Sequence, residues 1–143
     1  AGRTFHEPSF ATPDGKARFH ATPLPAEASP AGGFRLMTLR SEGQFNTVVY
    51  EEEDLYRGNT RRDVVMMARE DADRLHVAEG DRVSVETEAG AMEVSVSLVE
   101  IRPGNLAMYY PEANVLVPRR IDTRSKTPAF KSVAARVRPL EEA

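Results

Sequence analysis

Two stretches of the sequence concentrate side chains that could bind a polar ligand. Residues 38–47 combine Thr, Arg, Ser, Gln and Asn directly after an alternating apolar stretch. Residues 111–131 add Asn, Ser and Thr together with several Arg and Lys. Amide and hydroxyl groups beside guanidinium and ammonium groups suit a polar ligand that carries phosphates. An ordinary solvated loop has the same composition, and composition alone favours that second interpretation.

Other patterns that would indicate catalysis or metal binding are weak or absent. The three histidines are isolated in the sequence, so we expect surface or packing histidines rather than ligands. The acidic run 51–54 lacks the spacing and central glycine of a calcium loop, and we expect it to be solvated. There is no Gly-x-Ser-x-Gly elbow, Walker loop or Gly-x-Gly-x-x-Gly turn. Without cysteine, the chain itself cannot ligate an iron–sulfur cluster. We therefore predict no catalytic residue and no metal ligand within these residues.

The overall composition is that of an ordinary globular domain. A chain of 143 residues, 41% hydrophobic and 29% charged, is long enough for one domain with a real core. Its net charge of −3 argues against a general nucleic-acid binder, which needs a basic excess. No apolar run approaches the ~20 residues of a membrane span. We expect a cytoplasmic protein and, because the chain does not open on Met, a piece of a longer one.

A compact β-rich unit is predicted over residues 63–98. Residues 64–67 form an apolar run typical of a buried strand, and residues 69–75 have the spacing of a short amphipathic helix with acids in its first turn. Gly80 supplies the positive φ that a tight turn demands. A small closed β-barrel is the natural architecture, because closure removes exposed strand edges. The strands that the apolar patterns predict are residues 34–40, 64–67, 82–87, 92–98, 106–110 and 132–138.

Residues 1–33 differ from the rest of the chain. They are rich in Pro, Gly, Ala and Ser, with few apolar residues. Pro13 and Gly15 predict a turn, and residues 10–19 around them a hairpin. The three prolines in residues 22–33 predict a linker. We therefore divide the chain into a loosely held hairpin and Pro-rich linker (1–33), from the preceding part of a parent chain, and a barrel domain (34–143).

The order and spacing of several short motifs resemble a known family. They are residues 38–47 (TLRSEGQFNT), 56–58 (YRG), 63–67 (DVVMM), 110–114 (YPEAN) and 125–131 (SKTPAFK). Together they are similar to the C-terminal molybdopterin dinucleotide-binding domain of formate-dehydrogenase-like molybdopterin oxidoreductases, in the branch described as alpha subunits. The similarity covers about residues 34–138 and reaches back to residues 13–19.

This resemblance implies a mainly β protein, a double-psi β-barrel with one or two short helices. It further implies a parent enzyme that holds bis-molybdopterin guanine dinucleotide with molybdenum or tungsten, and a domain without activity of its own. The partners implied are the remaining domains of that oxidoreductase, and an electron-transfer subunit is a further candidate; neither nucleic acid nor membrane is implied. The loop at Gln44 carries His-Tyr in some formate dehydrogenases, so formate is not inferred as substrate. By position, the residues implied to contact the cofactor are Thr38, Arg40, Ser41, Gln44, Phe45, Asn46, Asn114 and Lys131.

Two other functions occur on the same kind of barrel. A double-psi barrel also serves as a protein-interaction or adaptor module without cofactor, as in the N-terminal domains of some AAA ATPases. A self-processed decarboxylase would need a Gly-Ser pair, and none occurs. The placement of the two polar loops discriminates between cofactor binding and an adaptor role, because a cofactor site requires both loops at one end of the barrel.

Overall fold

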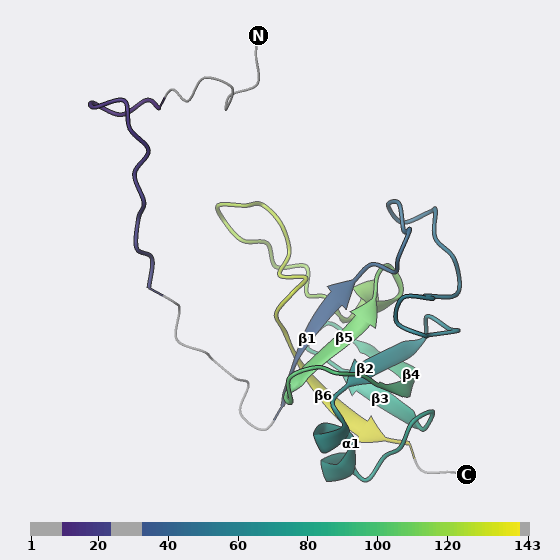
Figure 1. The fold of residues 1–143 in the computed structure, drawn as a ribbon. Helices are drawn as coiled ribbons and strands as arrows, with labels where there is room; N and C mark the ends of the chain where they lie inside the picture. Colours follow the sequence, from purple (N-terminus) through teal and green to yellow (C-terminus); the bar gives the residue numbers. More distant parts are fainter. Residues whose placement is uncertain (1–9, 24–32, 141–143) are drawn as a thin grey trace.

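The computed structural model describes residues 10–23 and 33–140, and its ordered elements lie in residues 34–139. Over these residues, six strands form a closed barrel in the order β1-β5-β2-β4-β3-β6 (Figure 1). The mainly β barrel with one short α-helix is therefore confirmed. Besides the α-helix, a short 3-10 helix lies directly after β5. The elements are β1 (Phe34–Leu39), β2 (Val64–Met67), α1 (Arg69–Leu75), β3 (Arg82–Glu86), β4 (Ala91–Leu98), β5 (Asn105–Tyr109), η1 (Glu112–Leu116) and β6 (Val133–Pro139).

Two of the strand pairs in the barrel are parallel. β1 runs parallel to β5, with Leu36 opposite Leu106, and β2 runs parallel to β4. The other four neighbouring pairs are antiparallel. Parallel neighbours cannot be joined by a tight hairpin, so the chain must cross the barrel between them. The two longest connections, residues 40–63 and 110–132, join β1 to β2 and β5 to β6, which are not neighbours in the barrel.

The core fills the inside of the barrel and is closed at one end by α1. Alternate residues point inward, and Leu36, Val85 and Leu106 are completely buried there. α1 contributes Ala72, followed by Val77, to the same cluster. The outward side chains of β2 are buried as well, against part of β5 and the segment after β4. Burial on both faces explains why β2 is an uninterrupted apolar run rather than an alternating one.

The strand directions bring the long loops to one end of the barrel. β6 is antiparallel to β1 and β2 is antiparallel to β5, so the ends of β1 and β5 lie beside the starts of β2 and β6. Residues 40–63 connect β1 to β2, and residues 110–132 connect β5 to β6. Both segments therefore lie at the same end, which is the upper end in Figure 1 and is called the loop end below.

The N-terminal segment contains the predicted turn. The Gly15 amide donates to the Thr12 carbonyl at 3.0 Å, and Gly15 has a φ of 66°. Residues 10–23 contain no strand, so within the described part of the chain the hairpin is present only as its turn. Most of the predicted Pro-rich linker falls in residues 24–32, outside the described residues.

Replacing a barrel residue should show which apolar side chains stabilise the fold. Leu106→Ala leaves a cavity in the core and should lower the free energy of unfolding by about 2–5 kcal/mol. Leu55→Ala, the same substitution at a side chain that is 82% exposed, should change it by no more than about 0.5 kcal/mol. Urea unfolding of both variants measures the difference. Equal losses would contradict the placement of Leu106 in the core.

Candidate functional site

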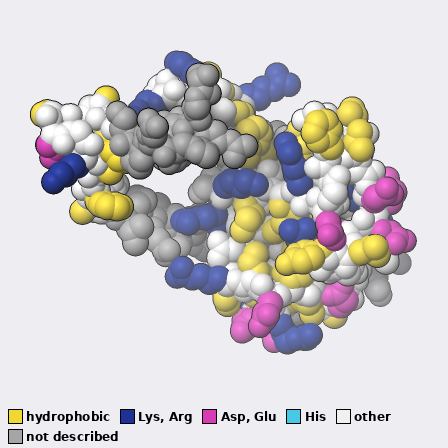
Figure 2. All heavy atoms as spheres, turned by 45° about the horizontal axis from the view of Figure 1, so that its top comes forward, with side chains coloured by type: hydrophobic (Ala, Val, Ile, Leu, Met, Phe, Trp, Pro, Cys, Tyr) yellow, Lys and Arg dark blue, Asp and Glu magenta, His cyan; other side chains and the backbone are white. Residues whose placement is uncertain are grey.

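The two polar loops meet at the loop end and carry opposite charges. Residues 117–132 contain five basic side chains and one acidic side chain, whereas residues 51–54 are four consecutive acids. Figure 2 looks towards this end and shows Asp and Glu side chains gathered on one side of it and Lys and Arg mainly on the other. An anionic ligand would therefore be attracted towards the side formed by residues 117–132.

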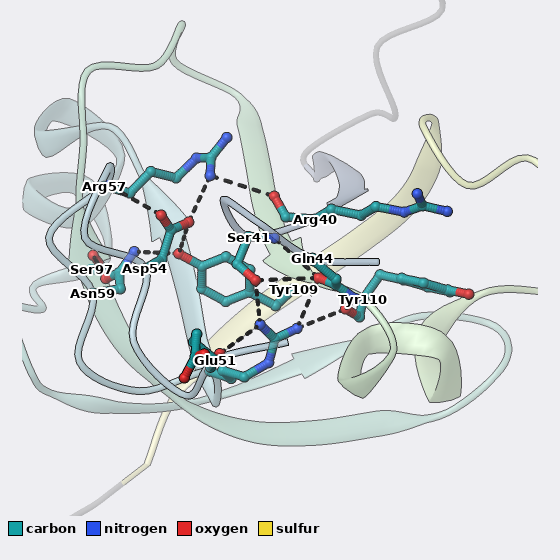
Figure 3. A network of polar contacts seen from close by, with 11 residues as sticks. Arg40, Ser41, Gln44, Glu51, Asp54, Arg57, Asn59, Ser97, Tyr109 and Tyr110 are labelled. Carbon is teal, nitrogen blue, oxygen red and sulfur yellow. Dashed lines mark hydrogen bonds and ion pairs between the residues drawn. The ribbon is translucent and has the colours of Figure 1, made fainter. Parts of the chain in front are cut away.

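A pocket of about 210 Å³ lies where β1, β5 and the second loop come together. The Thr38 amide donates to the Phe130 carbonyl at 2.9 Å, and the Lys131 ammonium group donates to the Thr38 carbonyl. The Arg40 guanidinium lies 5.8 Å from the centre of the Tyr110 ring, and in Figure 3 its side chain points away from the neighbouring polar network. The pocket thus combines two cationic groups with two aromatic rings. Its lining residues are Thr38, Leu39, Arg40, Tyr110, Phe130 and Lys131.

Behind this pocket, the buried side chain of Arg62 ties the two loops together. It forms a two-point ion pair with Glu112 of η1, with Nε–Oε1 at 2.6 Å and Nη2–Oε2 at 3.1 Å. It also donates to Ser41 Oγ and to the Tyr110 carbonyl, both at 2.7 Å. The guanidinium lies 4.1 Å from the centre of the Tyr50 ring. One cation therefore joins the start of the β1–β2 loop, its middle, and the segment after β5.

The Gln44 amide is fully used inside this network. Its oxygen accepts from the Ser41 amide at 3.1 Å and from Arg62 at 3.3 Å. Its nitrogen donates to the carbonyls of Asn46 at 3.0 Å and Tyr110 at 2.8 Å. Asn46 takes a φ of 59°, a conformation that asparagine tolerates better than most residues. Gln44 therefore shapes the loop from within, and a direct contact with a ligand would require breaking these bonds.

A second buried network fixes the other half of the β1–β2 loop (Figure 3). The Tyr109 hydroxyl donates to Asp54 at 2.8 Å and accepts from the Asn59 side chain at 3.0 Å. Ser97 of β4 donates to the Asn59 side-chain oxygen at 2.8 Å. Arg57 completes the network through an ion pair with Asp54 at 2.6 Å. Our expectation that the whole run 51–54 is solvated is thus wrong at Asp54, whose side chain is a buried, fully paired acceptor.

The pKa values of Asp54 and Tyr109 in this network shift in opposite directions. Burial alone would raise the pKa of the Asp54 carboxyl, but hydrogen bonds from Arg57 and Tyr109 outweigh it and hold that pKa below its ordinary value. Burial raises the pKa of Tyr109 to about 12, opposed by the hydrogen bond from Asn59 and reinforced by the Asp54 carboxylate. The network is therefore most stable with Asp54 ionised and Tyr109 neutral.

The structure brings the eight predicted site residues to the loop end, where three line the pocket, three form the network behind it and two belong to neither. Thr38, Arg40 and Lys131 line the pocket. Ser41, Gln44 and Asn46 form the network behind it, with the first two buried. Phe45 is 68% exposed on the loop, and Asn114 is exposed on η1 and does not line the pocket. Polar loops at opposite ends of the barrel would have excluded a shared site, but the structure places both at the loop end. That these eight residues contact a cofactor stays a prediction.

Sequence reasoning missed Arg62, which holds the loop end together. Its only signal in the sequence is an arginine two residues before an apolar strand, which is also the signature of an ordinary exposed arginine. The neighbouring Arg61 illustrates this, since it is exposed and pairs with Asp63 at the surface. Tyr110 and Phe130 were part of the recognised motifs but were not assigned to the site, because nothing in the sequence shows that their rings face the same pocket.

The histidines and carboxylates form no metal site in the described residues. His20 and His76 are exposed, and His76 ends α1 in the left-handed conformation with a φ of 56°. No group of three or more His, Cys, Asp or Glu in residues 10–23 and 33–140 could hold a metal ion. His6 lies outside these residues. Among the helices described, none is long and apolar enough to cross a bilayer.

The family model of the "Molydopterin dinucleotide binding domain" matches residues 34–134, which include strands β1 to β5, the start of β6 and both polar loops. The chain belongs to this family, as the sequence motifs predicted. An uncharacterized oxidoreductase of Mycobacterium tuberculosis is 36% identical over 142 residues, covering 91% of this chain and 18% of the relative. Protein YdeP of Escherichia coli is 32% identical, covering 93% and 19%. An assimilatory nitrate reductase of Haloferax mediterranei is 28% identical, covering 95% and 21%.

The chain thus spans about a fifth of the length of the curated relatives it matches. Among solved structures, acetylene hydratase from Pelobacter acetylenicus is similar with a TM-score of 0.58 and 15% identity, covering 76% of this chain and 18% of that one. At this identity the likeness shows the fold alone. The expected double-psi β-barrel is confirmed, whereas the assignment to the formate-dehydrogenase-like group stays a prediction.

Replacing Arg62 should destabilise the protein far more than replacing its neighbour. Arg62→Ala leaves the Glu112 carboxylate without its ion pair and should lower the free energy of unfolding by about 3–5 kcal/mol. Arg61→Ala removes an exposed ion pair and should cost about 0–1 kcal/mol. Urea denaturation of the two variants gives the comparison. If both cost the same small amount, Arg62 is not a buried anchor.

The shift of Tyr109 predicts a loss of stability at high pH. Because its folded pKa of about 12 lies above its ordinary value of 10.0, its contribution is fully present below pH 10 and is lost as the pH rises towards 12. Tyr109→Phe should remove this component, which is about 1–3 kcal/mol, while Tyr56→Phe at an exposed ring should retain it. Denaturant unfolding at several alkaline pH values measures both. An identical pH dependence in wild type and Tyr109→Phe would contradict the buried hydroxyl network.

The lowered pKa of Asp54 predicts a separate loss of folding stability at acidic pH. Its contribution is present above the ordinary carboxyl value of 3.8 and is lost as the pH falls through the lower folded value. Asp54→Asn should therefore flatten the acid limb of the stability curve, and Glu52→Gln, at an exposed carboxyl of the same run, should leave it unchanged. Thermal unfolding as a function of pH measures this limb.

Proposed function

We propose that this domain forms one side of the binding site for bis-molybdopterin guanine dinucleotide in a longer molybdenum or tungsten oxidoreductase of the formate-dehydrogenase-like group. The observation that carries the proposal is the pocket at the loop end, in which Arg40 and Lys131 lie beside the rings of Tyr110 and Phe130. Membership of the molydopterin dinucleotide binding domain family supports it. When bound, the metal of the cofactor would supply the redox chemistry, and this chain would supply binding and orientation.

The residues of the pocket suit a dinucleotide in their chemistry. Guanidinium and ammonium groups form charge-assisted hydrogen bonds with phosphate oxygens, and Arg40 is free to extend towards one. Flat aromatic rings and an exposed guanidinium provide stacking surfaces for a planar heterocycle. The Lys131 ammonium group already contacts a backbone carbonyl, so binding a phosphate would require only that its flexible side chain turn.

The size of the pocket indicates that this chain holds only part of the cofactor. Pockets that enclose a drug-sized ligand have volumes of about 300–1,000 Å³, and this one has about 210 Å³. A dinucleotide is larger than a drug-sized ligand. The rest of its surface would be covered by the remaining domains of the oxidoreductase, and an electron-transfer subunit would be a further partner. We place such an enzyme in the cytoplasm.

The internal bonds of Ser41 and Gln44 suggest a different role for these two residues from the one that the motifs implied. We propose that they hold the 41–46 backbone in the shape that presents Arg40 and Asn46 to the ligand. The amides and carbonyls of that loop, rather than the Gln44 side chain, would then read the hydrogen-bonding edge of the pterin.

Cofactor retention tests the proposal directly. In the full-length oxidoreductase, Arg40→Ala or Lys131→Ala removes one charge-assisted contact and should weaken binding by about 1.5–3 kcal/mol, or roughly 10- to 150-fold. The free energy of unfolding of the apoprotein should hardly change, because exposed charges contribute little to it. Guanine released from the purified protein, measured by chromatography, reports how much dinucleotide each variant retains.

Arg124→Ala is the matched control for this experiment. Arg124 is an exposed cation of the same loop that does not line the pocket. Its removal should leave the retained dinucleotide unchanged. Equal retention in Arg40→Ala, Lys131→Ala and Arg124→Ala would reject the pocket as the binding site and favour an adaptor role for the barrel.

A further inference from the structure

The β1–β2 loop exposes an unusual number of large apolar side chains. Each is more than half exposed, although they lie within twelve consecutive residues, here called the 45–56 loop. Apolar side chains scattered singly on a surface need no explanation, but a concentration of them marks a contact site. These side chains are Phe45, Val48, Val49, Leu55 and Tyr56.

The backbone that carries these side chains is held in place. Phe45 and Val49 form an isolated β-bridge with hydrogen bonds of 2.8 and 3.3 Å, and Asp54 and Asn59 form a second one. Asp54 and Asn59 are also bonded to the buried hydroxyl of Tyr109. A loop fixed in this way loses little conformational entropy when a partner covers it. Its apolar side chains are thus presented on a preformed surface.

Charge and position define the surface that would cover the loop. Residues 51–53 are three exposed glutamates that lie between the two apolar groups of the loop. Apolar side chains interspersed with exposed carboxylates fit a partner surface that combines apolar and basic side chains. The loop is also joined to the pocket, because Arg57 donates to the Arg40 carbonyl at 3.4 Å.

We propose that the 45–56 loop docks onto the remainder of the longer polypeptide to which this domain belongs. This inference rests on the proposed function, since it takes the domain to be part of a longer oxidoreductase. The chain spans about a fifth of its curated relatives, so about four fifths of such a protein is left to provide the contact. The surface that completes the small pocket must approach the loop end, and the exposed apolar side chains lie at that end.

Hydroxyl-radical footprinting of the full-length protein tests the contact. Tyr56 and Phe45 are reactive aromatic side chains, and docking should lower their oxidation rates at least about fivefold relative to the same protein unfolded in urea. Oxidation of both at the unfolded rate would overturn the proposal. So would protection that disappears when a dimer dissociates on dilution, which would identify a second copy as the occupant. Protection lost on removing a co-purified second polypeptide would likewise overturn it and identify a separate subunit.

A charged variant and its control extend the test. Val48→Glu combined with Leu55→Glu should restore oxidation of Tyr56 towards the unfolded rate in the full-length protein. Ile121→Glu, at an apolar side chain of similar exposure to Val49 on the other loop, should not. Restored oxidation in both variants, or in neither, would overturn the assignment to the 45–56 loop. If the double variant does not fold, the wild-type footprint decides alone.

The guanine content of the same sample separates this inference from the proposed function. Protected Tyr56 in a protein that never contains the dinucleotide would reject the cofactor proposal and leave the docking contact standing. Freely oxidised Tyr56 in a protein that retains the dinucleotide would reject the docking contact and leave the cofactor proposal standing.

Discussion

The buried guanidinium of Arg62 is the interaction on which the loop end depends. A buried cation is costly unless every donor has a partner, and here the partners come from three separate stretches of the chain, at Ser41, at Tyr50 and Glu51, and at residues 110–112. The ion pair with Glu112 fixes η1, and the bond to Ser41 fixes the first residues after β1. Because the loss of either Arg62 or Glu112 would break the ion pair between the loops and leave the other charge without it, the two loops are held as a unit. Their shape does not depend on regular secondary structure, of which they contain little.

The barrel supplies the other half of the arrangement. A closed sheet has no free edges, and its strand order separates β1 from β2 and β5 from β6, so long connections join these successive strands. Both long connections begin and end at the same end of the barrel. The pocket with Arg40 and Lys131 is formed where they meet β1 and β5. A rigid core thus carries a variable polar end, which is a common way for small β domains to build a ligand site.

The sequence was sufficient for the barrel and insufficient for the details of the site. Alternation placed the strands within one or two residues, and the apolar run of β2 was recognised as buried, because these patterns follow from local geometry. Family motifs located the polar loops. Asp54 was misjudged as solvated since its partner Tyr109 is 55 residues away, and Arg62 was missed for the same reason. Whether a charged side chain is buried is decided by long-range contacts, which leave no periodic trace in the sequence.

The loops also explain why the recognised motif residues differ in role. Gln44 sits in a motif, but its amide bonds are all made within the protein, whereas Arg40 leaves the network and faces the pocket. A motif therefore combines residues that meet a ligand with residues that hold them in position, and only the hydrogen-bond partners distinguish the two.

A structure of the full-length protein with its bound cofactor is the most direct test of the central claim. Nitrogen atoms of Arg40 and Lys131 should lie within about 2.7–3.2 Å of phosphate oxygens of the dinucleotide. The Gln44 amide should keep its present partners in that structure. A dinucleotide bound elsewhere, with the pocket of Arg40 and Lys131 open to solvent, would contradict the account.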